Sequence, residues 1–325
     1  MFDKTIDLNE VDSIDVFKNN NSKRTRITLL VFQNCNYNCS YCFRGNDKNK
    51  KPIDFEKLEK IFTNLGPFLD YHNKIFPNIN EYDIKIIGGE PTLVDLSKLF
   101  KKLIGSPYKK FFRICTNFHK SVTYFENCYN TIIKDDSSLL INASIHSEYV
   151  KNDMVAFFEK AKILKAFKNI DVNFSYVLNE STIKFAKEVD LLSKQYEQNV
   201  LYQLDIKNPN LIGGGEILDF YTHQNQINKE NCKITFLDGK ELFGNNKDLK
   251  RFITSKNFSN FKCSATTGEN NIMINCETGE LHICSNNTES FGNVLENKYL
   301  FSKDFKFCKS KRCSISCNRM FISRK

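Results

Sequence analysis

Apolar, β-branched runs alternate with amphipathic segments between residues 26 and 207, and this alternation constrains the fold more than any other feature. Helical spacing of apolar residues, with Asp54 in position to cap the first helix, predicts helices at 54–65, 95–104, 121–133, 153–167 and 181–196. The predicted strands are 26–32, 82–87, 111–116, 138–145, 170–178 and 200–207. Such alternation favours a parallel sheet with right-handed crossovers. Six strands over about 180 residues predict an α/β fold, an open, partial (β/α)6 barrel rather than a closed eight-stranded one.

The length of the chain predicts a second, smaller domain. At 325 residues the chain exceeds the size at which one hydrophobic core stops growing. The glycine-rich stretch LIGGGEILDF (211–220) resembles a flexible linker more than a phosphate-binding loop. We therefore expect a barrel domain at 1–215, and a linker with a small α+β domain at 216–325.

The composition limits the cellular compartment and the kinds of binding partner that we expect for this protein. The sequence has no apolar run of about 18 residues and no apolar signal region at its start, so we expect a cytoplasmic protein without a membrane partner. In that compartment the 12 cysteines are expected to be reduced thiols that bind metal or react. The net charge of +9 comes from lysines scattered along the chain, which makes nucleic acid an unfavoured partner.

Three cysteines lie within eight residues in the stretch QNCNYNCSYCFRG (33–45). Cys35, Cys39 and Cys42 have the spacing C-x3-C-x2-C and follow the first predicted strand directly. Three thiolates are one ligand short of a closed tetrahedral site. The residues alone allow two interpretations: a zinc site with one remote ligand, or an iron–sulfur cluster with one iron left free for a substrate or cofactor.

Polar residues also follow or end the second, third and fourth predicted strands. Gly88-Gly89-Glu90-Pro91 follows the second strand, Asn117 the third, and Ser144 and His146 end the fourth. Working residues in parallel sheets lie on loops at the carboxyl ends of the strands. We therefore expect these loops to converge on the cysteine loop.

The cysteine triad followed by Phe43, and then by the GGEP motif, resembles the radical S-adenosylmethionine (SAM) superfamily over roughly residues 26 to 207. The resemblance implies that the three cysteines hold a [4Fe–4S] cluster whose free iron binds SAM. It further implies reductive cleavage of SAM to a 5′-deoxyadenosyl radical, which abstracts hydrogen from a substrate. The implied SAM-binding residues are Phe43, Gly88, Gly89, Glu90, Pro91, Asn117, Ser144 and His146. Phe118 departs from the Thr-Asn-Gly often found in the family.

A second group of cysteines lies near the C-terminus. The stretch 271–284 predicts a β-hairpin that turns at Thr278-Gly279 and places Cys284 opposite Met273. The spacing Cys263-x15-Gly279-x4-Cys284 resembles the SPASM/twitch extensions of radical SAM enzymes. This resemblance implies an auxiliary cluster on four of Cys263, Cys284, Cys308, Cys313 and Cys317, and a zinc ribbon is the alternative. Cys276 lies too near the hairpin tip to be a ligand, and Cys115, Cys128 and Cys232 are expected to be buried structural residues.

The resemblance implies an enzyme that abstracts hydrogen from a small molecule or a peptide, with net oxidation or cross-linking aided by the auxiliary cluster. It also implies an electron donor such as flavodoxin or ferredoxin. Only 34 residues precede Cys35, which favours a small molecule such as a sugar or amino-acid derivative. No residue of the sequence is assigned a catalytic role. The alternatives are a non-catalytic zinc or iron–sulfur module, and an RNA-modifying radical enzyme.

Overall fold

The computed structural model describes residues 6–17, 23–42, 52–150, 153–205, 217, 220–221, 232–244, 258–283, 290–308 and 319–324. The chain divides into two compact units. The first comprises Met1–Leu29, Thr63–Ile84 and Ile227–Lys325, and the second comprises Leu30–Phe62 and Lys85–Gln226. Each unit therefore draws on separate stretches of the sequence.

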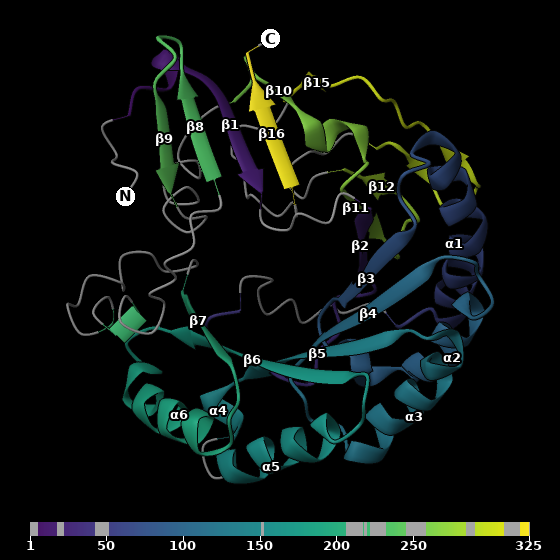
Figure 1. Ribbon diagram of the computed structural model, residues 1–325. Coiled ribbons are helices and arrows are strands. Elements are labelled where there is room, and N and C mark those ends of the chain that lie inside the picture. Colours follow the sequence, from purple (N-terminus) through teal and green to yellow (C-terminus); the bar gives the residue numbers. More distant parts are fainter. Residues whose placement is uncertain are drawn as a thin grey trace. The chain divides into compact units, whose positions relative to one another are not determined.

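The second unit contains most of the alternating strands and helices that the sequence predicts (Figure 1). Its sheet has the strand order β3-β4-β5-β6-β7, and β4, β5, β6 and β7 pair in parallel. The α/β class with a parallel sheet is thereby confirmed. The strands are β3 (Glu81–Ile87, whose first four residues belong to the first unit), β4 (Lys109–Thr116), β5 (Ser138–Ile145), β6 (Ile170–Leu178) and β7 (Val200–Leu204). The helices are α2 (Leu96–Phe100), α3 (Val122–Ile132), α4 (Ser147–Val150), α5 (Met154–Lys165) and α6 (Ile183–Gln195).

Helices α2, α3 and α5 cover one face of this sheet (Figure 1). Phe112 of β4 packs on Phe100 of α2 with ring centroids 4.5 Å apart, and Phe174 of β6 packs on Phe158 of α5 at 4.7 Å. Because side chains alternate along a strand, every second residue of β4, β5 and β6 faces these helices and is buried. The residues between them are mostly half-buried and face the other side of the sheet.

Two predicted helices differ in length from those observed. Helix α1 (Phe55–Ile75) starts where expected, since the Asp54 carboxylate accepts a 2.9 Å hydrogen bond from the backbone N–H of Lys57. It continues well past the predicted end at Leu65 and through Pro67, because Phe68 and Leu69 are fully buried and extend its apolar face. The predicted helix 95–104 is instead a five-residue helix, α2, followed by a 3₁₀ turn at Lys101–Leu103.

The first unit contains a six-stranded sheet with the order β15-β10-β16-β1-β8-β9 (Figure 1). At its centre, β1 (Val11–Phe17) pairs antiparallel with β16 (Arg319–Ser323) and with β8 (Cys232–Phe236). The other strands of this unit are β2 (Arg24–Leu30, whose last residue belongs to the second unit), β9 (Glu241–Gly244), β10 (Lys262–Cys263), β11 (Asn271–Asn275), β12 (Leu281–His282), β13 (Gly292–Asn293), β14 (Lys298–Tyr299) and β15 (Lys306–Phe307).

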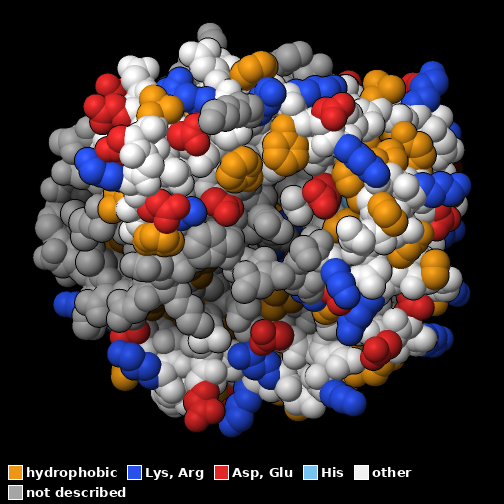
Figure 2. Space-filling view, turned by 45° about the horizontal axis from the view of Figure 1, so that its top comes forward, with side chains coloured by type: hydrophobic (Ala, Val, Ile, Leu, Met, Phe, Trp, Pro, Cys, Tyr) orange, Lys and Arg blue, Asp and Glu red, His pale blue; other side chains and the backbone are white. Residues whose placement is uncertain are grey.

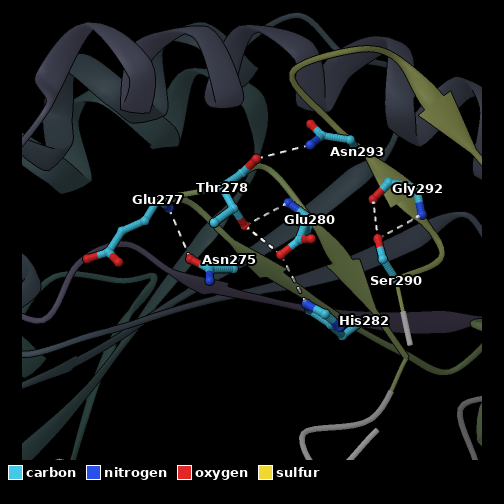
Figure 3. A network of polar contacts seen from close by, with 8 residues as sticks. All are labelled: Asn275, Glu277, Thr278, Glu280, His282, Ser290, Gly292 and Asn293. Atoms are coloured by element: carbon cyan, nitrogen blue, oxygen red, sulfur yellow. Dashed lines mark hydrogen bonds and ion pairs between the residues drawn. The ribbon is translucent and has the colours of Figure 1, made fainter. Parts of the chain in front are cut away.

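The hairpin near the C-terminus is confirmed, with a register different from the predicted one. Met273 pairs with His282 rather than with Cys284, because the turn spans four residues, Cys276–Gly279, instead of two. Figure 3 shows how the turn is held: Asn275 accepts from the N–H of Glu277 at 3.0 Å, and Asn293 donates to the carbonyl of Thr278 at 3.0 Å. Gly279 has a φ of +78°, and a Cβ there would meet Leu295.

No helix within the described ranges has the length and apolar character needed to cross a membrane. On the face seen in Figure 2, Lys and Arg side chains are interspersed with Asp and Glu side chains.

Candidate functional site

The cysteine loop, residues 31–42, follows β2 and carries the three predicted ligands. Cys39 is only 6% exposed, whereas Cys35 and Cys42 are half-buried. The backbone N–H of Cys42 donates to the carbonyl of Cys39 at 3.1 Å, which turns the loop back on itself. Burial, followed by the charges of Glu148, Cys35 and Cys42, raises the pKa of Cys39 to about 12. The three thiols thus lie near enough to repel one another as thiolates.

The three thiols lie near one another, but they do not converge on one point where they could bind a single metal ion. Among the described residues, no three His, Cys, Asp or Glu side chains are grouped closely enough to hold a metal ion. The donor set itself, three thiols on one loop, fits an iron–sulfur cluster, because thiolates are its normal ligands.

Gly88 and Gly89 lie in direct contact with the start of the cysteine loop. The N–H of Gly89 donates to the carbonyl of Phe32 at 2.8 Å, and the N–H of Glu90 donates to the carbonyl of Asn34 at 2.7 Å. A Cβ at Gly88 would lie 2.6 Å from the carbonyl oxygen of Phe32, and one at Gly89 would overlap the backbone of Asn34. The two glycines are therefore required for the close approach of the two loops.

The Glu90 carboxylate, 1% exposed, holds the neighbouring loops together. Its Oε1 accepts from the N–H of Thr92 at 3.0 Å, from the Thr92 hydroxyl at 2.5 Å and from the Thr116 hydroxyl at 2.7 Å. Its Oε2 accepts from the N–H of Asn117 at 2.6 Å. Pro91 starts a 3₁₀ turn, Pro91–Leu93, which Glu90 caps. Since Oε2 takes only one of these hydrogen bonds, it keeps capacity for a further donor.

The loop after β4 joins the same site. The Asn117 amide nitrogen donates to Asn36 of the cysteine loop at 2.8 Å, and its carbonyl accepts from the ring of His119 at 2.8 Å. Phe118 has a φ of +60°, a left-handed conformation that favours glycine. The Lys160 ammonium stabilises this backbone conformation by donating hydrogen bonds to the carbonyls of Phe118 and Lys120. It also lies 4.2 Å from the centroid of the Phe118 ring. Burial lowers the pKa of Lys160 to about 8.

The segment His146–Tyr149, which we call the clamp segment, lies against the cysteine loop. Nδ1 of His146 is 3.2 Å from the Cys39 sulfur and 3.0 Å from the Tyr41 hydroxyl. Burial lowers the pKa of His146 to about 4, so the imidazole is neutral at pH 7.

Two further side chains of the clamp segment contact the cysteine loop. The Tyr149 hydroxyl accepts from the N–H of Asn38 at 2.6 Å, and its ring stacks on Tyr37 with centroids 4.0 Å apart. The Glu148 carboxylate accepts from the N–H and the hydroxyl of Ser40. The sequence analysis did not identify three residues of this site, Glu148, Tyr149 and Lys160. The only signal for Glu148 and Tyr149 was their position in a polar stretch directly after a strand. Lys160 lies on a helix with other lysines, so its residue type did not distinguish it.

Ser144 lies on the face of β5 away from the helices, and its hydroxyl is 3.1 Å from that of Ser175. The structure thus brings Cys35, Cys39, Cys42, Gly88, Gly89, Glu90, Asn117 and His146 into one set of contacting loops, and Ser144 lies two residues before His146. Phe43 lies outside the described residues.

In the first unit, Cys263 and Cys308 lie on neighbouring segments. Cys263 pairs with Lys306, and the N–H of Cys308 donates to the carbonyl of Phe261 at 2.9 Å. This register makes the two cysteines diagonal neighbours, roughly 7–8 Å apart. Cys284, Cys313 and Cys317 lie outside the described residues.

Of the three cysteines predicted to be buried structural residues, Cys128 and Cys232 are buried and Cys115 is not. Cys128 and Cys232 are fully buried, and so is Cys276, whose thiol pKa is raised by burial. Cys115 is instead half-buried, because its position on β4 points it away from the covering helices.

No protein-family model matches the sequence, and neither does any curated protein. Among solved structures, anSMEcpe with bound AdoMet aligns with a TM-score of 0.52 at 15% identity, over 84% of this chain and 78% of that chain. This chain has the fold of anSMEcpe. Streptococcus suis SuiB bound to S-adenosylmethionine aligns with a TM-score of 0.49 at 14% identity, over 86% of this chain. The alignment covers 65% of SuiB, just under two thirds of its length.

Proposed function

We propose that this protein is a radical SAM enzyme, which cleaves S-adenosylmethionine reductively and abstracts hydrogen from a substrate. The observation that carries the proposal is the contact between the C-x3-C-x2-C loop and the Gly88-Gly89-Glu90 turn, with no room for a Cβ at either glycine. The shared fold with anSMEcpe, determined with bound AdoMet, supports it further.

Cys35, Cys39 and Cys42 would hold a [4Fe–4S] cluster, which supplies the electron that cleaves SAM when it is bound. The protein's part is to position these ligands. The Gly88-Gly89-Glu90 turn supports the loop from one side, and the clamp segment holds it through His146, Glu148 and Tyr149.

The polar groups around the loop would bind SAM. The remaining acceptor capacity of Glu90 Oε2 suits the ammonium group, since a buried carboxylate forms strong hydrogen bonds with a cation. The Ser144 hydroxyl suits the ribose, because a hydroxyl both donates and accepts.

We propose a second, auxiliary cluster in the first unit, with Cys263 and Cys308 among its ligands. The pairing of β10 with β15 supports this, because it places the two thiols as diagonal neighbours. Such a cluster could accept the electron left after hydrogen abstraction, so that the outcome is a net oxidation or a cross-link in a small molecule or a peptide. A flavodoxin or ferredoxin would supply the first electron.

The test is anaerobic reconstitution of the purified protein with iron and sulfide, followed by dithionite and SAM. Wild-type protein should form 5′-deoxyadenosine, measured by chromatography, and Cys35→Ala, Cys39→Ala and Cys42→Ala should each reduce it below detection. Cys128→Ala is the matched control, because this buried thiol lies on α3, away from the cysteine loop. Turnover that survives in any of the three variants would contradict the proposal, and so would bound zinc without sulfide at this loop.

A further inference from the structure

The loop of residues 117–120, which we call the β4 loop, contacts both Glu90 and the cysteine loop. The backbone N–H of Asn117 donates to Glu90 Oε2 at 2.6 Å, and the side-chain amide of Asn117 donates to Asn36 at 2.8 Å. Glu90 Oε1 has three donors, whereas the N–H of Asn117 is the one donor to Oε2 in the described part of the chain. The position of Asn117 therefore fixes the direction in which Oε2 points.

The β4 loop has a backbone conformation that phenylalanine does not favour. Phe118 has a φ of +60°, at which the Cβ of an L-residue crowds the backbone. The Phe118 ring is nevertheless fully buried, and it packs on Phe125 and Phe157 with centroids 5.2 and 5.0 Å apart. Because the ring is fixed in the core, the backbone beside it needs contacts that offset this strain.

Lys160 supplies such contacts from α5. Its ammonium donates to the carbonyls of Phe118 and Lys120, and it lies 4.2 Å from the ring centroid of Phe118 and 5.5 Å from that of Phe157. In the described ranges no carboxylate pairs with this ammonium, so carbonyl oxygens and ring faces stabilise its charge. Its lowered pKa, about 8, shows that burial of the charge is costly.

We propose that Lys160 is a positioning residue for SAM, which holds the β4 loop so that Asn117 keeps Glu90 Oε2 directed at the ammonium group of SAM. This inference rests on the proposed function, in which Glu90 binds that group. Lys160 donates its hydrogen bonds to the backbone of the β4 loop, so its effect on Glu90 passes through that backbone. A residue that acts in this way should change the affinity for SAM and leave the rate of cleavage of bound SAM unchanged.

Three consecutive backbone N–H groups report the conformation of the β4 loop. Besides the N–H of Asn117, the N–H of Phe118 is bonded and donates to the Thr116 hydroxyl at 2.9 Å. The N–H of His119 donates to the side-chain carbonyl of Asn117 at 3.2 Å. Such groups exchange with solvent hydrogen when the local structure opens. Their exchange rates therefore measure how firmly the loop is held, without SAM.

The first experiment is hydrogen exchange, read by mass spectrometry on the peptides that contain residues 117–119 of reconstituted protein without SAM. Lys160→Met removes the charge and keeps most of the side-chain volume, whereas Lys160→Arg keeps a cation with several donors. Exchange should be about tenfold faster in Lys160→Met, as expected from the loss of a hydrogen bond to a charged group, and close to wild type in Lys160→Arg. The matched control is Lys162→Met, at an exposed position on the same helix, which should exchange like wild type.

The second experiment measures 5′-deoxyadenosine formation by the same four proteins over a range of SAM concentrations, with dithionite as reductant. Lys160→Met should raise the KM for SAM about tenfold and keep kcat within about twofold, because bound SAM is cleaved by the same groups. Lys160→Arg and Lys162→Met should have KM values close to wild type. If melting temperature and iron content show that Lys160→Met does not fold, Lys160→Gln replaces it.

Unchanged exchange or an unchanged KM in Lys160→Met would overturn the inference, and so would a fall in kcat at unchanged KM. An equally large effect in Lys160→Arg or in Lys162→Met would also overturn it, because the hydrogen bonds to the β4 loop would then not be the cause. Absence of 5′-deoxyadenosine in the wild-type enzyme would instead refute the proposed function.

Discussion

The cysteine loop and the β10–β15 strand pair both bring cysteines together, but by different means. Cys35, Cys39 and Cys42 lie within eight residues of sequence, and loops from three strands hold them in place. Cys263 and Cys308 are far apart in sequence and become neighbours only because β10 pairs with β15. Local spacing defines the first group, whereas sheet formation creates the second. Substitutions beside the first group should therefore affect one of the two proposed clusters, and substitutions in the second group should affect only the other.

Gly89→Ala should produce the largest effect, because the added Cβ would overlap the backbone of Asn34 in the cysteine loop. We expect loss of the cluster at Cys35, Cys39 and Cys42, measured as loss of SAM cleavage and of about half the iron. Gly66→Ala in α1 is the control: nothing lies within 4 Å of its added Cβ, and alanine in a helix should stabilise by about 0.5–1 kcal/mol. Full iron content in Gly89→Ala would show that the loop can move away.

Changing Cys263 and Cys308 together to Ala should have the complementary effect. Reconstituted wild-type protein should contain ~8 iron, and the double variant ~4, because only one of two cubane clusters would be lost. SAM should still be cleaved, while conversion of substrate should fail. Unchanged iron in the double variant would remove the auxiliary cluster from the proposal.

Glu90→Gln tests how firmly the loops depend on one carboxylate. The amide cannot accept all four hydrogen bonds that Glu90 receives, so we expect a loss of roughly 2–4 kcal/mol in the free energy of unfolding. Urea denaturation measures it, with Glu126→Gln on α3 as control. If stability is unchanged and SAM binding alone weakens, Glu90 serves the ligand rather than the loops.

His72 probes the first unit, since its Nε2 lies 3.2 Å from the carbonyl of Gly268 in the turn that follows Cys263. Burial lowers the pKa of His72 to about 4. The unfolded chain therefore takes up a proton as pH falls below 6.5, and the folded chain does so only near pH 4. Stability should fall across this window, by roughly 2 kcal/mol at pH 5.

His72→Gln should remove this part of the pH dependence. The measurement is urea denaturation of both proteins at pH 7.5 and pH 5. An equal loss of stability in the variant would assign the pH dependence to other groups.

Tyr149→Phe should give the smallest effect. It removes one hydrogen bond, to the N–H of Asn38, and keeps the stacking on Tyr37. The expected cost is about 1 kcal/mol, or a roughly fivefold faster loss of iron from the cysteine loop to a chelator. Tyr129→Phe, on α3, is the control. Equal rates for all three proteins would show that the hydroxyl does not hold the loop.

The sequence by itself determined the alternating strands and helices of the second unit. It also singled out the cysteine loop as a candidate site. Hydrophobic periodicity and short cysteine spacing are local properties, so that β4, β5 and β6 and the Asp54 cap could be predicted from nearby residues. The end of α1 could not, because Pro67 suggests a stop that the burial of Phe68 and Leu69 overrides.

Only the tertiary structure decided which distant residues meet. The acidic segment Val11–Phe17 gave no sign that it would form a central strand between β16 and β8, since strand pairing depends on partners about 220 to 310 residues away. Likewise Glu148, Tyr149 and Lys160 are ordinary surface residue types in the sequence. Their contacts with the loops of the site arise because parallel strands bring their carboxyl ends to one edge of the sheet.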